Sequence, residues 1–173
     1  MNYILTFIKF ILLLLWLTGC SVKSPTPEEN LSKIGNLTKM LLNTSKSIDK
    51  NEAEDFAKSS VYYAQTLAHN YKVISPPLWQ NTLVNLGLKK RGLCYEWAND
   101  LWVYLKAKNY KSLTLHYVGA DVGNYFEHNA LSVSAKELGV NNSILLDAWR
   151  NSGNLYFIEI AKDKKYSWKE RLD

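Results

Sequence analysis

The sequence is poor in cysteine and histidine, with two cysteines and three histidines among 173 residues. So few and so widely separated ligands cannot form a recognisable zinc cluster. The chain also lacks a glycine-rich loop that would cradle phosphate groups, and it lacks the Gly-x-Ser-x-Gly turn of serine hydrolases. These absences argue against zinc-binding proteins, phosphate-loop proteins and serine hydrolases, and we expect no cofactor.

A strong, localised excess of charge of one sign is missing as well. The formal net charge is +5, and the lysines and glutamates are interspersed along the chain. Nucleic-acid-binding domains instead concentrate their basic residues in a patch or stripe. We therefore expect no nucleic-acid partner.

The N-terminal segment contains the longest apolar run of the chain. Residues 10–17 are apolar, Lys9 precedes them, and residues 17–20 read LTGC. A run of this length followed by small residues is typical of a cleaved signal and not of a membrane-spanning helix. The segment resembles the bacterial lipobox, which implies that residues 1–19 are removed and that Cys20 is acylated and becomes the mature N-terminus. Because Ser21 is not aspartate, the resemblance favours the outer membrane, facing the periplasm.

Cys94 is then left without an intrachain partner in a compartment where disulfides normally form. An unpaired thiol in such a place is a liability unless it is buried or used. Considered by itself, Cys94 fits a small buried hydrophobe on the core face of a helix better than it fits a catalytic thiol.

Composition and periodicity divide the remainder into a tether and one domain. Residues 20–29 are polar and contain proline, which is typical of a linker, and residues 30–173 are enough for a single domain with its own core. Apolar spacing predicts four helices. The first spans 31–47, the second runs from a cap at Asp49 or Asn51 to residue 71, and the last two span 76–88 and 94–108. Runs of β-forming residues predict strands over 113–118, 129–133, 144–148 and 155–160. Helices followed by strands predict an α+β fold, a helical N-terminal part packed on an antiparallel sheet.

Three residues in this arrangement have the chemistry of a thiol catalyst. Cys94 begins a predicted helix, His128 opens a predicted strand, and Asp147 closes another. A nucleophilic cysteine must ionise, which a helix N-terminus and a neighbouring imidazolium both favour. A carboxylate on the second ring nitrogen would orient the histidine, and adjacent antiparallel strands can bring His128 and Asp147 together. His116 is the competing base, but its place inside an apolar run favours a structural role.

The segments around these residues read RGLCYEWA at 91–98, HNALSV at 128–133 and LLDAW at 145–149. In order and spacing they resemble the transglutaminase-like branch of the papain-like cysteine enzymes, over about a third of the chain. The resemblance implies a papain-like core with the nucleophile at a helix N-terminus, and acyl transfer through a thioester. It assigns nucleophile, proton carrier and orienting acid to Cys94, His128 and Asp147.

The family also implies an oxyanion hole and, in some members, a calcium site. The backbone N–H of Cys94 or Tyr95 could supply part of an oxyanion hole. A further side-chain donor is expected, for which Gln80 and Trp79 are candidates, although nothing in the sequence fixes them near the thiol. Some relatives bind calcium beside the cysteine, but two scattered carboxylates, Glu96 and Asp100, do not make a metal site.

The sequence thus favours a lipid-anchored cysteine hydrolase or acyl transferase that acts on amide bonds of a protein or of cell-wall peptide. Its partners would be the membrane, through Cys20, and that substrate. A non-catalytic envelope lipoprotein of the same fold, binding a protein partner or the cell wall, is the alternative. A peptidoglycan endopeptidase matches less well, because such enzymes commonly have a second histidine where this chain has Asp147.

Overall fold

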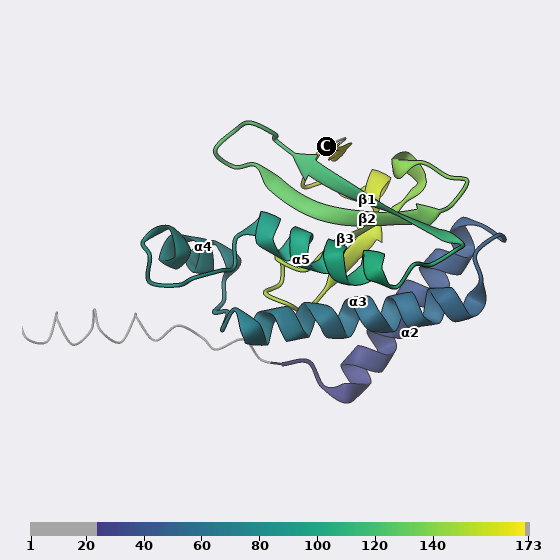
Figure 1. Ribbon diagram of the computed structural model, residues 1–173, viewed down its shortest axis with the longest axis horizontal. Helices are drawn as coiled ribbons and strands as arrows, with labels where there is room; N and C mark the ends of the chain where they lie inside the picture. Colours follow the sequence, from purple (N-terminus) through teal and green to yellow (C-terminus); the bar gives the residue numbers. More distant parts are fainter. Residues whose placement is uncertain (1–23, 172–173) are drawn as a thin grey trace, which may run out of the picture.

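A computed structural model describes residues 24–171. The expected signal segment 1–19 and the first part of the tether, 20–23 with Cys20, lie outside this range. Within it, four helices pack on a five-stranded antiparallel sheet, so the α+β prediction is confirmed (Figure 1). None of the helices between residues 24 and 171 has the length and apolar character needed to cross a membrane.

The first two helices form as the apolar spacing predicts, and each begins at a side-chain cap. They are α2 (Pro27–Thr44) and α3 (Lys50–Asn70). Thr26 accepts from the backbone of Glu29 and the Glu29 carboxylate accepts from the backbone of Thr26, which satisfies two free N–H groups reciprocally. Because of this cap, α2 begins inside the range 20–29 that the sequence suggests as tether. Asp49 caps α3 by accepting from Glu52 N at 2.9 Å.

Two further helices follow, the short α4 (Pro77–Asn85) and α5 (Cys94–Ala107). Leu101 and Leu105 on α5 are fully buried, and so is Trp97. In Figure 1, α5 lies between the sheet and α3, with α2 beyond, and α4 stands beside the N-terminal end of α5. The buried apolar residues of α2, α3, α5 and one face of the sheet form a single core.

The sheet has the order β4-β3-β2-β1-β5, with every neighbouring pair antiparallel. Its strands are β1 (Leu113–Ala120), β2 (His128–Ala135), β3 (Ile144–Asp147), β4 (Tyr156–Glu159) and β5 (Lys169–Glu170). The first four correspond to predicted strands. The sequence does not predict β5, because two exposed residues have no apolar alternation.

Side chains of β2 alternate between two apolar layers. Leu131 and Val133 face the helices, whereas Ala130 packs in a second cluster with Leu145 and Ile160. The C-terminal segment contributes Trp168 to this second cluster. The sheet is therefore covered by helices on one face and by the end of the chain on the other.

Candidate functional site

Cys94 is the first residue of α5, and the segment before it is held at several points. Leu93 cannot cap the helix with its side chain, so the Glu96 carboxylate accepts from Gly92 N at 2.6 Å and from Leu93 N at 2.9 Å. Trp97 Nε1 donates to Gly92 O at 3.0 Å. These contacts fix the chain immediately before Cys94, whose side chain is partly exposed.

Arg91 and Gln80 extend this support. Arg91 makes a two-pronged ion pair with Asp100, at 2.8 and 3.0 Å, and its Nε also reaches Glu96. Gln80 is fully buried; its amide donates to Arg91 O at 2.8 Å and accepts from Ile74 N at 3.1 Å. A Cβ on Gly92 would come within 2.7 Å of the Gln80 side chain, and Gly92 has a φ of +131°, so glycine is required there.

These contacts involve Gln80, the suggested oxyanion donor, and Glu96 and Asp100, the carboxylates considered for calcium. Gln80 supports the backbone before Cys94 and does not line the cleft that contains it. Glu96 and Asp100 are engaged with Arg91. In the part of the chain from 24 to 171, no group of three or more histidine, cysteine or carboxylate side chains could hold a metal ion.

His128 and Asp147 meet through the register of β2 and β3. Leu131 pairs with Leu146, so continuing the ladder by one step sets Asp147 opposite Ala130 and diagonal to His128 on the same face. His128 Nε2 lies 2.7 Å from Asp147 Oδ2. Both side chains are almost fully buried. Asp is unfavourable in a strand, and this contact supplies the reason for its presence.

Asp147 accepts more than one hydrogen bond. Arg150 donates to it from Nε at 3.0 Å and from the backbone N at 2.9 Å. Burial by itself would raise the pKa of Asp147, but the hydrogen bond and charge of His128, with the charge of Arg150, hold it below its usual value. Asp147 is therefore a carboxylate, and His128 Nε2 carries the proton between them.

The second nitrogen of His128, Nδ1, is then the one available to Cys94. Burial alone lowers the pKa of His128, but the hydrogen bonds that its ring donates to Asp147 and Cys94, with the charges of both, outweigh burial and raise the pKa to about 9. The Cys94 thiol also lies 3.7 Å from the carbonyl oxygen of Glu127. At neutral pH the imidazole beside the thiol is therefore protonated.

Aromatic rings enclose the His128 ring. The ring centroids of Trp149 and Tyr166 are each 4.7 Å from that of His128, and the centroid of Trp168 is 5.3 Å away. Trp168 donates to Asp163, which forms a buried ion pair with Arg150. The negative faces of aromatic rings favour a cationic partner, so this enclosure suits an imidazolium.

Comparisons with protein-family models, curated proteins and solved structures gave no match. What the site does must be inferred from its own residues. The three groups singled out from the sequence as catalytic, Cys94, His128 and Asp147, are brought together, and Tyr95 follows the thiol as the second residue of α5.

Cys94 and His128 share a cleft of about 680 Å³. Its lining includes Leu78 and Asn81 of α4, and Tyr125 and Phe126 of the β1–β2 loop. Trp149 and Tyr166 also line the cleft. The cleft gives a substrate access to the thiol from solvent.

Sequence reasoning missed several of these residues. Arg150 and Asn81 were not singled out, although Asn81 Oδ1 accepts from Trp149 Nε1 at 3.0 Å. Tyr166 and Trp168 likewise receive no role in the site from the sequence. Two aromatic residues in an otherwise charged tail are a signal that the tail covers something apolar.

The competing base, His116, is buried in a different setting. Its Nε2 lies 2.8 Å from Ser134 Oγ and its Nδ1 lies 2.5 Å from Glu170 of β5. The Ser134 hydroxyl also lies within hydrogen-bond distance of two backbone carbonyls. His116 therefore holds β5 against β1, as its position in an apolar run suggests.

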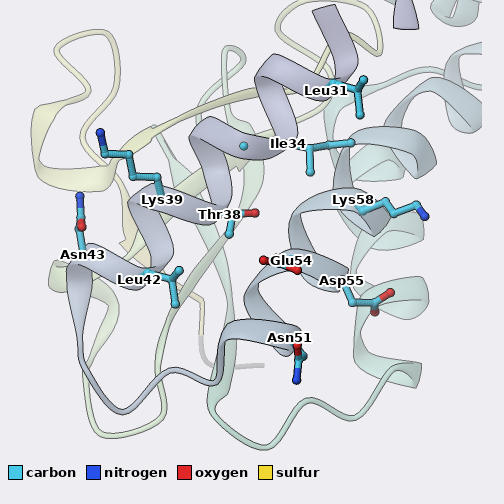
Figure 2. Close-up of a pocket in the computed structure, with 11 residues that line it drawn as sticks. Leu31, Ile34, Thr38, Lys39, Leu42, Asn43, Asn51, Glu54, Asp55 and Lys58 are labelled. Atoms are coloured by element: carbon cyan, nitrogen blue, oxygen red, sulfur yellow. The ribbon is translucent and has the colours of Figure 1, made fainter. Parts of the chain in front are cut away.

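A second hollow, of about 730 Å³, lies between α2 and α3 (Figure 2). Figure 2 shows apolar side chains of α2, such as Ile34 and Leu42, and charged side chains of α3, such as Glu54 and Lys58, around it. Its lining has no cysteine or histidine. This groove therefore offers neither a thiol nor an imidazole.

Proposed function

We propose that this protein is a lipid-anchored cysteine hydrolase or acyl transferase with a papain-like, transglutaminase-like core, acting on amide bonds of a protein or of cell-wall peptide. One observation carries the proposal. A half-buried thiol at the start of α5 shares a cleft with His128, whose Nε2 is bound to the buried carboxylate of Asp147. A structural histidine needs no such combination of a thiol, a carboxylate and an open cleft.

The resting site would be a thiolate–imidazolium pair. The positive end of α5 and the protonated His128 both stabilise negative charge on Cys94 Sγ. The thiolate attacks the carbonyl carbon of the amide, and the carbonyl oxygen takes the negative charge. His128 Nδ1–H then protonates the departing amine as the C–N bond breaks, which leaves an acyl thioester on Cys94.

In the second half of the reaction, the thioester is broken down and His128 acts as a base instead of an acid. Neutral His128 removes a proton from water, or from an attacking amine, as the new bond to the acyl carbon forms. The C–S bond breaks and the thiolate returns beside the imidazolium. Asp147 accepts the Nε2–H bond throughout, so it keeps the ring oriented and stabilises its charge.

The first turn of α5 offers donors for the oxyanion. The Glu96 cap uses the N–H groups of Gly92 and Leu93, and the next two, on Cys94 and Tyr95, are the first N–H groups of the helix. Such groups have no acceptor inside a helix. We assign the oxyanion to them, and we assign Gln80 a positioning role through Arg91 O.

The test is to incubate the full-length chain with an unfolded protein and, separately, with cell-wall peptide, and to analyse the products by mass spectrometry. Added hydroxylamine would intercept the thioester as a hydroxamate. Cys94→Ala should abolish both the products of the amide reaction and the hydroxamate. Val103→Ser, on the exposed side of α5, should leave both unchanged. Products that persist in Cys94→Ala would overturn the proposal.

The lipid anchor is a separate part of the proposal, supported by residues 10–20 of the sequence. Acylation of Cys20 would hold the domain at the outer membrane, facing the periplasm, on a short tether. Cys20→Ser should release the chain from the membrane fraction and end its labelling with radioactive palmitate. Membrane association that survives this substitution would contradict the anchor.

A further inference from the structure

The cleft around Cys94 has unusually apolar edges for a surface that meets water. Tyr125 is 90% exposed and Phe126 is 74% exposed, both in the β1–β2 loop. Leu78 of α4, which lines the same cleft, is 63% exposed. Exposed apolar side chains gathered around one hollow mark a binding surface more often than isolated ones do.

The loop that carries the two aromatic residues is anchored below them. The Glu127 carboxylate accepts from Gly123 N at 2.8 Å and forms an ion pair with Arg171. The ring centroids of Tyr125 and Phe126 are 5.1 Å apart in an edge-to-face arrangement. The loop therefore presents a paired aromatic surface to solvent from a fixed base.

The charges along the cleft nearly cancel. Arg150 is neutralised by Asp147 and Asp163, and Glu127 is paired with Arg171. Among the charged residues that line the cleft, Asp121 and Lys165 remain without an ion pair in the described range 24–171, and they have opposite signs. A substrate with several carboxylates would find little to neutralise it here.

We infer that the substrate class of this site is an extended polypeptide with large apolar side chains on both sides of the scissile amide. Leu78 would contact one side, and Tyr125 with Phe126 the other, while the amide lies over Cys94. Cell-wall stem peptides, which carry free carboxylates and small side chains, fit this cleft poorly. The inference rests on the proposed function for the position of the amide, whereas the binding preference follows from the edges of the cleft alone.

Fluorescence anisotropy of labelled peptides on full-length Cys94→Ala protein tests the preference without requiring turnover. The probes are an octapeptide with Leu and Phe flanking a central Ala-Gly, the same peptide with Glu at the flanking positions, and a cell-wall stem peptide. The apolar peptide should bind at least about tenfold more tightly than the other two.

Variants then locate the binding. Adding Tyr125→Ser and Phe126→Ser should weaken binding of the apolar peptide at least about tenfold. Adding Val103→Ser, which replaces an exposed apolar residue outside the cleft, should not. Circular dichroism checks that each variant is folded. Equal binding of the acidic or stem peptide, no binding of the apolar one, or no effect of the loop substitutions would each overturn the inference. Because the assay uses Cys94→Ala protein, the result of the assay does not depend on whether the thiol is catalytic.

Discussion

At the scale of single residues, the site depends on His128 being a cation beside the buried carboxylate of Asp147. Asp147 is buried and fixed by Arg150, so its charge is not screened by water. The three aromatic rings around His128 keep water from the imidazole. This burial would by itself lower the pKa of His128, and the contact with Asp147 counteracts it.

Asp147→Asn should lower the pKa of His128 from about 9, because the substitution removes the carboxylate charge while keeping a side chain of the same size. It should also destabilise the fold by roughly 3–5 kcal/mol, since one half of a buried ion pair is left unpaired. NMR titration of the His128 ring and urea unfolding measure the two effects. Glu159→Gln, which breaks an exposed ion pair with Lys162, is the matched control and should change neither. A His128 titration that is the same in Asp147→Asn would contradict the assigned contact.

At the scale of elements, α5 must begin at Cys94 and nowhere else for the thiol to meet the helix end. The sequence predicts this start from Gly92 and the apolar spacing, but it does not predict how the start is stabilised. The Glu96 carboxylate performs that role, in place of the side-chain cap that Leu93 cannot provide. Arg91, paired with Glu96 and Asp100, offsets the negative charge that this cap brings near the thiol.

Glu96→Ala should therefore lower the free energy of unfolding by about 1–2 kcal/mol through loss of the cap, and should slow the reaction of Cys94 with alkylating agents. Thermal unfolding and alkylation kinetics measure the two effects. Glu54→Ala on α3, which removes an exposed pair with Lys50, should change stability by less than about 0.5 kcal/mol and leave alkylation unchanged. If both variants behave alike, Glu96 does not position the thiol.

The elements also show where sequence reasoning succeeds and where it stops. Helices α2, α3 and α5 and strands β1 to β4 follow local apolar spacing and caps, so they are predictable. The contact between His128 and Asp147 depends on a strand register that is set by packing of Leu131 and Leu146, which spacing along the chain does not reveal. The role of Gln80 is similarly hidden, because it depends on close packing against Gly92.

At the scale of the whole molecule, the C-terminal segment completes the second layer of the sheet. Its ion pair between Asp163 and Arg150 and the pairing of β5 with β1 bring Tyr166 and Trp168 onto His128. The chain end therefore belongs to the site. A tail that is mostly charged gives few local signals for this, because its contacts are to residues distant in sequence.

The pH dependence of folding should reflect the buried pair. Because the pKa of His128 is raised, its contribution to stability is fully present below 6.5 and is lost as pH rises through about 9. Asp147 has a lowered pKa, so its contribution is present above 3.8 and is lost as pH falls through its folded value. The difference in unfolding free energy between wild type and Asp147→Asn should thus narrow as pH rises past about 9. Urea unfolding across this range measures it, and a constant difference would contradict the assigned charges.

The proposed mechanism requires that His128 activates the Cys94 thiol in the cleft that both residues line. The most direct measurement is the rate at which iodoacetamide alkylates Cys94 in the folded protein as a function of pH, with the modified residue identified by peptide mapping. Wild type should still react rapidly at about pH 6, where an ordinary thiol is almost wholly protonated, and His128→Ala should be at least about tenfold slower there. Alkylation of Cys94 only after unfolding, or equal rates in the two proteins at every pH, would contradict the account.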